Sequence, residues 1–135
     1  MSGSDPARAF AGFDRPALLV TGTLDGQPIP GIGVSPDRRL ATFAAMPPSA
    51  NKFLLVVDKA DHMYFNGTRG LRDQGALGHR DTDFAAVETL GYPLVKAVST
   101  AYWETYLRAD AAALRWLKEG GAAALVATKG SFKNK

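Results

Sequence analysis

An aspartate and a histidine each follow a short apolar run in this chain, and together they are the residue types of a general-base pair. Asp25 follows the run at 17–22, and His62 follows the run at 52–58. Both runs are rich in leucine and valine and have the length of β-strands, so each side chain is expected just beyond a strand. A carboxylate that orients an imidazole lets the imidazole take a proton from a hydroxyl or from water. The pair therefore predicts hydrolysis, with the nucleophile still to be assigned.

The elements around these residues predict an α/β fold, a small parallel sheet with flanking helices. A helical pattern at 38–46 lies between the two strands and ends before Pro47, and a second helical pattern starts at Phe84. The order strand, helix, strand, helix predicts parallel strands joined by a crossover. Two parallel strands are too few for a stable sheet, so at least one strand edge is expected either to be covered or to pair with another chain.

The second half of the chain predicts helices, with less pattern at its end. The helical pattern is interrupted before Pro93, which is expected to begin a new helix because proline favours the first turn. Asp110 is the expected N-cap of a helix at 111–118, which a pair of glycines closes. Residues 122–135 show no clear period beyond a short Ala-Leu-Val run, and their lysine-rich end is interpreted as read-through or a tag remnant.

Length and composition predict a single domain that spans residues 1–135. The chain carries 16 Lys and Arg against 13 Asp and Glu, a formal charge of +3 without a basic stripe, so no nucleic-acid partner is expected. It contains no cysteine, which excludes disulfides, thiol nucleophiles and thiolate metal sites. No segment has the pattern of a signal peptide or a membrane span, so a cytoplasmic protein without a membrane partner is expected.

Three segments resemble parts of the α/β-hydrolase superfamily, in particular its dienelactone-hydrolase and polyester-hydrolase branch. Pro16–Asp25 (PALLVTGTLD) resembles the strand that delivers the acid of the catalytic triad. Lys52–His62 (KFLLVVDKADH) resembles the last strand with the catalytic histidine, and Val98–Leu107 (VSTAYWETYL) resembles the final helix. The resemblance covers a core of about residues 14–118 and implies a truncated α/β-hydrolase fold, the C-terminal half of the family, whose sheet is completed by oligomerisation.

This resemblance implies roles for Asp25 and His62 and leaves the nucleophile open. Asp25 would orient His62, and His62 would take the proton of a serine. The nucleophile elbow of the family, Gly-x-Ser-x-Gly, is absent. Gly31-Ile-Gly-Val-Ser35 has a different spacing, and Pro36 follows it. Ser35 is an alternative nucleophile if its loop folds back to His62; otherwise the acid and the base are relics.

A metal site is a second way in which these residues would hydrolyse a bond without a serine. Asp25, Asp61 and His62 are expected close together, and His79 lies on the long segment that follows. Carboxylates and imidazoles are ligands of Zn²⁺ and Mn²⁺, and a bound divalent metal supplies an activated water. The spacing matches no named metal motif. The alternative is that Asp61 is a solvated turn residue and His79 a surface histidine.

The leading hypothesis is a hydrolase of ester or phosphoester bonds with its site at His62 and Asp25, acting directly or through a metal-activated water. Its partners would be a small-molecule ester and further copies of the same chain, joined as a homo-oligomer through the exposed sheet edge. One alternative is a non-catalytic remnant that acts as an oligomeric or interaction module. Another is a subunit that needs a separate nucleophile-bearing partner. The absent elbow favours these alternatives, whereas the intact Asp25 and His62 favour catalysis.

Overall fold

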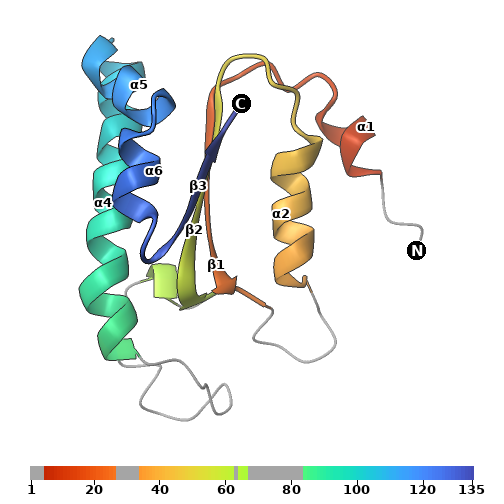
Figure 1. Ribbon diagram of the computed structural model, residues 1–135. Helices are drawn as coiled ribbons and strands as arrows, with labels where there is room; N and C mark the ends of the chain where they lie inside the picture. The colour runs from red at the N-terminus through yellow and green to blue at the C-terminus, as the bar shows by residue number, and fades with distance from the viewer. Residues whose placement is uncertain (1–4, 27–33, 63, 67–83) are drawn as a thin grey trace.

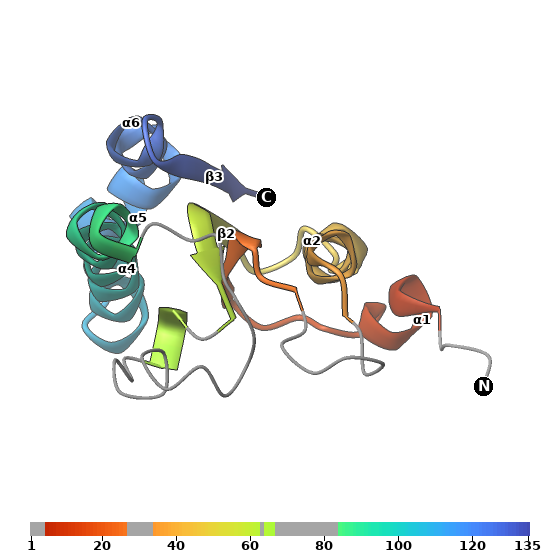
Figure 2. The same ribbon diagram turned by 90° about the horizontal axis from the view of Figure 1, so that it is seen from below.

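The computed structural model describes residues 5–26, 34–62, 64–66 and 84–135. Within them a small sheet stands between two layers of helix, so the expected α/β class is confirmed (Figure 1). One layer contains α4 (Phe84–Leu107), α5 (Ala111–Lys118) and α6 (Gly121–Val126). The other contains α2 (Pro36–Ala45), with the short α1 (Pro6–Phe10) beyond it, as the view from below shows (Figure 2). None of the helices in these ranges is both long and apolar enough to span a bilayer.

The two expected strands are present and run parallel. β1 (Ala17–Leu24) pairs with β2 (Lys52–Asp61), from Ala17 opposite Lys52 to Gly22 opposite Val57. Helix α2 is the crossover between them, as a parallel connection requires. The first six residues of β2 are all buried, because this strand lies in the middle of the sheet with helices over both faces.

The carboxyl ends of β1 and β2 are irregular, and a glycine makes this irregularity possible. The register between the strands shifts just after Gly22. A Cβ atom at Gly22 would lie 2.0 Å from the carbonyl oxygen of Ala60, so a larger residue does not fit without displacement of the backbone. Beyond the shift, the amide of Lys59 donates a hydrogen bond to Thr23 Oγ1 at 2.8 Å. This hydrogen bond and the close approach at Gly22 hold the ends of β1 and β2 together. Asp25 and His62 are the residues that come directly after these strand ends.

A third strand makes the sheet mixed, which corrects the expected purely parallel topology. β3 (Gly130–Asn134) runs antiparallel to β2 on the side away from β1. The Phe132 ring stacks on Phe53 with the ring centroids 6.0 Å apart, while Ser131 and Lys133 are exposed. The segment interpreted as a tag remnant is therefore part of the sheet. Its sequence pattern is weak because β3 is a short edge strand with one inward-facing aromatic side chain.

Helix α4 continues through Pro93, so the predicted interruption at this residue is wrong. A proline inside a helix removes one amide donor and typically costs about 3 kcal/mol. Leu94 and Val98, which follow it, are buried in the core. The Tyr92 hydroxyl also donates a hydrogen bond to the carbonyl oxygen of Tyr64 at 3.1 Å. Packing against the sheet offsets the local cost of the proline, and periodicity alone does not reveal that packing.

The predicted helix at 111–118 is confirmed together with its cap. The carboxylate of Asp110 accepts hydrogen bonds from the amides of Ala113 and Ala112 at 3.1 and 2.7 Å. These two bonds lower the pKa of the Asp110 carboxyl, because they stabilise its charged form. After the helix, Gly120 adopts a φ of 96°, a left-handed conformation that glycine reaches without strain.

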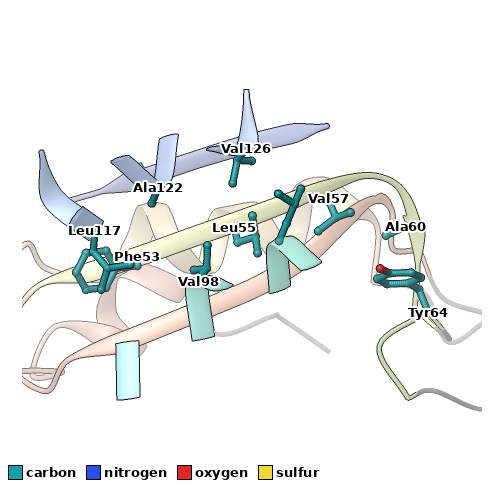
Figure 3. Close-up of a cluster of buried hydrophobic side chains, with 10 residues drawn as sticks. Phe53, Leu55, Val57, Ala60, Tyr64, Val98, Leu117, Ala122 and Val126 are labelled. Atoms are coloured by element: carbon teal, nitrogen blue, oxygen red, sulfur yellow. The ribbon is translucent and has the colours of Figure 1, made fainter. Parts of the chain in front are cut away.

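The main hydrophobic core lies between the sheet and the layer of α4, α5 and α6 (Figure 3). Ala122 and Val126 of α6 belong to it, and α6 packs against α5 and β3. Within the part of the chain that the structure describes, the buried residues of this core are Phe53, Leu55, Val57, Ala60, Tyr64, Leu94, Val98, Leu117, Ala122 and Val126. A smaller cluster on the opposite face, beneath α2, contains Phe43, Leu54 and Val56.

Candidate active site

The structure brings Asp25 and His62 together at one edge of the sheet. Each residue directly follows the last residue of its strand, and parallel strands have their carboxyl ends on the same edge. Nδ1 of His62 lies 3.0 Å from Oδ1 of Asp25. The Asp25 side chain is 5% exposed, whereas the His62 side chain is 45% exposed. A buried carboxylate thus holds an accessible imidazole, which is how an acid orients a base.

A threonine on β1 holds the carboxylate of Asp25 in this direction. The Thr21 hydroxyl donates a hydrogen bond to Oδ2 of Asp25 at 2.7 Å, and both residues are buried. A buried carboxylate needs such partners because it has lost its water. With Oδ2 bound to Thr21, Oδ1 faces the imidazole. Because Nδ1 of His62 is bound to Asp25, Nε2 is the nitrogen left to exchange a proton with a ligand.

Arg39 is a third member of the site, which the sequence analysis missed. Its Nε donates to the carbonyl oxygen of Asp25 at 2.9 Å and lies 3.2 Å from Oδ1 of the same residue. Its Nη2 lies 3.3 Å from Nδ1 of His62. The only sequence signal was a basic residue in the first turn of the crossover helix, which begins near the edge where parallel strands end.

A cleft of about 240 Å³ opens beside the site on the α2 face of the sheet. Its apolar wall comes mainly from Leu19 and Leu54, and its polar part includes the side chains of Asp25 and Arg39. Small-molecule sites commonly combine an apolar wall with a few placed polar groups, so the cleft suits a small ligand. The described residues that line the cleft are Leu19, Val20, Thr21, Asp25, Arg39, Thr42 and Leu54.

Asp61, a candidate metal ligand, has a structural role. Its Oδ1 accepts a hydrogen bond from the amide of Tyr64 at 2.9 Å, at the start of the short helix η1 (Tyr64–Asn66). Asp61 is the last residue of β2 and is buried, so the alternative of a solvated turn residue is wrong. His79, the fourth candidate, lies outside the described residues. Among the residues that the structure describes, no three His, Asp or Glu side chains come close enough to hold a metal.

Asp25 and His62 fit a shared divalent cation poorly in this arrangement. Both carboxylate oxygens of Asp25 have partners: Thr21 donates a hydrogen bond to Oδ2, and Oδ1 contacts His62 and forms an ion pair with Arg39. The guanidinium of Arg39 also puts a positive charge beside Nδ1 of His62, where it would repel a cation. A metal at His62 would therefore bind Nε2 and need ligands other than Asp25.

Ser35, the alternative nucleophile, is the N-cap residue of α2. Its hydroxyl makes no capping hydrogen bond, and the residue is exposed. Its carbonyl oxygen accepts a hydrogen bond from the amide of Arg39 at 3.4 Å, so the two residues are one helical turn apart. Ser35 therefore lies at the end of α2 that faces the site, although no contact joins it to His62 within the described part of the chain.

Comparison of the chain with known proteins finds no match. None of the protein-family models matches the sequence, and neither the curated proteins nor the solved structures contain a match. The resemblance to α/β-hydrolases therefore stays a prediction. A function for this chain has to be inferred from the geometry of the site itself.

Proposed function

We propose that this chain is a hydrolase of ester or phosphoester bonds in which His62 is the general base and Asp25 orients it. The observation that carries the proposal is the 3.0 Å contact between His62 Nδ1 and Asp25 Oδ1, with the carboxylate buried and the ring half exposed. A histidine held at one nitrogen by a buried acid presents its other nitrogen in a fixed direction. The exposure of the ring leaves that nitrogen accessible to a substrate.

In the proposed reaction, the Nδ1 proton of His62 is hydrogen bonded to Asp25 and Nε2 carries a lone pair. Nε2 takes a proton from a water molecule as the water oxygen attacks the carbonyl carbon or the phosphorus of the ester. The carboxylate of Asp25 stabilises the imidazolium that forms. The imidazolium then returns the proton to the leaving alcohol oxygen as its bond breaks, which restores neutral His62.

Arg39 and the cleft support an ester or phosphoester substrate. Negative charge develops on the carbonyl or phosphoryl oxygens in the transition state, and a fixed positive charge nearby stabilises it. The guanidinium of Arg39 is such a charge, because its Nη2 lies 3.3 Å from the ring of His62. The apolar wall formed by Leu19 and Leu54 suits the hydrocarbon part of the same substrate.

The test is the rate of hydrolysis of activated carboxyl and phosphate esters by the wild type and by His62→Ala and Asp25→Asn. A general base typically contributes about 100-fold or more, so His62→Ala is expected to lose about that factor. Asp58→Asn is the matched control, because Asp58 is an exposed carboxylate on β2. A loss below about tenfold for His62→Ala would contradict the proposal. Ser35→Ala separates a serine nucleophile from a water.

The metal-assisted form of the proposal uses the same assay. Chelator-sensitive turnover that one divalent metal restores would support a metal-activated water at His62. Chelator-insensitive turnover would leave His62 acting directly on water or on Ser35. Because Asp25 is already occupied by hydrogen bonds, the direct form is the one that the geometry favours.

The outer edge of β1 favours a second candidate function, that of an oligomeric module. β1 is an edge strand of the order β1-β2-β3, and within the described ranges no strand pairs with its outer side. Its residues, Ala17–Leu24, include no charge and no proline, the usual protection of an edge. We propose that a second copy covers this edge and completes the sheet of a truncated hydrolase fold. Light scattering tests it: a dimeric or larger mass supports the pairing, and a monomeric mass contradicts it.

A third possibility is that the chain is one subunit of an enzyme whose nucleophile is on a separate chain. In that case a separate chain would bring the nucleophile to His62, and turnover would appear only after the two chains are mixed. Turnover by the purified chain alone would contradict it.

A further inference from the structure

Nδ1 of His62 has two neighbours that require opposite protonation of that atom. Oδ1 of Asp25, 3.0 Å away, accepts hydrogen bonds only, so it favours a proton on Nδ1. Nη2 of Arg39, 3.3 Å away, donates only, so it favours a lone pair on Nδ1. One nitrogen atom cannot satisfy both at once. The same arrangement of heavy atoms therefore accommodates two neutral forms of His62.

The two forms differ in what the exposed side of the ring offers to a ligand. With the proton on Nδ1, the lone pair is on Nε2 and the ring is a base. With the proton on Nε2, the ring accepts a hydrogen bond from Arg39 at Nδ1 and presents an N–H that cannot take a proton. Asp25 loses its imidazole donor in the second form but keeps the ion pair with Arg39, whose Nε lies 3.2 Å from Oδ1.

We propose that Arg39 is a positioning residue that sets the balance between these two neutral forms by competing with Asp25 for Nδ1 of His62. Arg39 acts at two atoms. The positive charge at its Nε, 3.2 Å from Oδ1 of Asp25, weakens the pull of that oxygen on the imidazole proton, and its Nη2 donates toward Nδ1. The planar guanidinium makes both contacts at once because its nitrogens form a rigid fork.

The guanidinium of Arg39 is held in place by a second contact, so it stays within reach of His62. Its Nε is anchored to the main-chain oxygen of Asp25 at 2.9 Å, and its side chain is 26% exposed. The functional meaning of the competition rests on the proposed hydrolase, because only the form protonated at Nδ1 is a base. Arg39 would then control the fraction of molecules that are ready to react.

The test is nitrogen NMR of the full chain labelled with ¹⁵N-histidine, recorded at alkaline pH. The shifts of Nδ1 and Nε2 report which of them carries the proton. The chain contains two histidines, and a His79→Gln variant assigns the signals. The wild type is expected to show both forms in exchange.

Two substitutions of Arg39 are expected to move this balance in the same direction. Arg39→Met removes the competing donors, and Arg39→Lys keeps the charge but loses the fork that reaches Asp25 and His62 together. Each is expected to raise the ratio of the Nδ1–H form to the Nε2–H form by about tenfold, the effect of losing one charge-assisted hydrogen bond. Asp25→Asn is expected to shift the ratio in the opposite direction. Arg38→Met, an exposed neighbour on α2, is the matched control and is expected to leave it unchanged.

Two results would overturn the competition. One is a wild type that carries the proton wholly on Nδ1. The other is a folded Arg39→Lys variant, checked by circular dichroism, that keeps the wild-type ratio; this variant decides the test if Arg39→Met does not fold. The ester assay is a separate readout. Absence of turnover in the wild type would reject the hydrolase and leave the NMR result standing. A rise in kcat at constant KM in Arg39→Lys, which keeps the positive charge that stabilises the transition state, would support control of the base by Arg39.

Discussion

The two faces of the sheet are packed to different degrees. Among the described residues, ten buried ones form the cluster between the sheet and α4, α5 and α6, whereas three form the cluster between the sheet and α2, beside a cleft of about 240 Å³. Asp25 and Arg39 line that cleft, so the candidate site is on the sparsely packed face. A close-packed interior leaves no room for a ligand. The dense face is therefore expected to supply most of the stability, and the sparse face leaves space for a ligand.

The largest predicted effect comes from two adjacent leucines of β2 that point to opposite faces. Leu55 is in the main core, and Leu54 lines the cleft. Leu55→Ala is expected to lower the free energy of unfolding by about 3–5 kcal/mol, because it leaves a cavity in a close-packed core. Leu54→Ala is expected to lose about 2 kcal/mol, because the adjoining cleft already provides free space. Urea unfolding measures both, and equal losses would contradict the contrast between the faces.

The second effect concerns Gly22, a residue of β1 that the backbone of β2 approaches closely near the strand ends. Gly22→Ala places a Cβ atom against the carbonyl oxygen of Ala60, so it is expected to cost about 1–3 kcal/mol. The displacement is also expected to change the NMR signals of the His62 ring, because both strand ends carry the site. Gly12→Ala is the matched control, since a Cβ there meets no atom within 4 Å. Similar losses for Gly22→Ala and Gly12→Ala would contradict the close-approach explanation.

The smallest effect is expected at the surface of the dense layer. Asp110 caps α5, and its lowered pKa means that folding favours the charged carboxylate. The stabilisation that the Asp110 carboxylate gives to the folded protein is therefore complete above the ordinary aspartate pKa of 3.8. It is lost as the pH falls through the lower pKa that Asp110 has in the folded state. Asp110→Ala is expected to destabilise the protein at neutral pH and to have less effect well below 3.8.

Urea unfolding at the two pH values measures this effect, with Asp14→Ala as the control at an exposed aspartate that caps no helix. The His62 signals are expected to stay unchanged in Asp110→Ala, because the cap is on the far side of the sheet from the site. An equal loss at both pH values would mean that the charge of Asp110 does not contribute through the cap.

The sequence predicted the elements whose patterns are local. The cap at Asp110 requires only one hydrogen-bond acceptor next to the two free amides at the start of the helix. The strands that precede Asp25 and His62 require only short apolar runs. Pro93 shows the limit of such rules, because a helix that packs well on a sheet tolerates a proline that would end an isolated helix. Phe132 shows a second limit of these rules. A short edge strand with one inward-facing aromatic side chain has almost no alternation of apolar and polar residues.

By itself, the sequence determined that Asp25 and His62 follow neighbouring parallel strands, because strand-forming runs and a crossover helix are properties of short segments and their order. Only the tertiary structure decided that Arg39 contacts both of them and that β3 pairs with the free side of β2. These contacts join side chains and strands from separate elements. Their distances follow from how α2 and α6 pack on the sheet, and no local pattern in the chain specifies that packing.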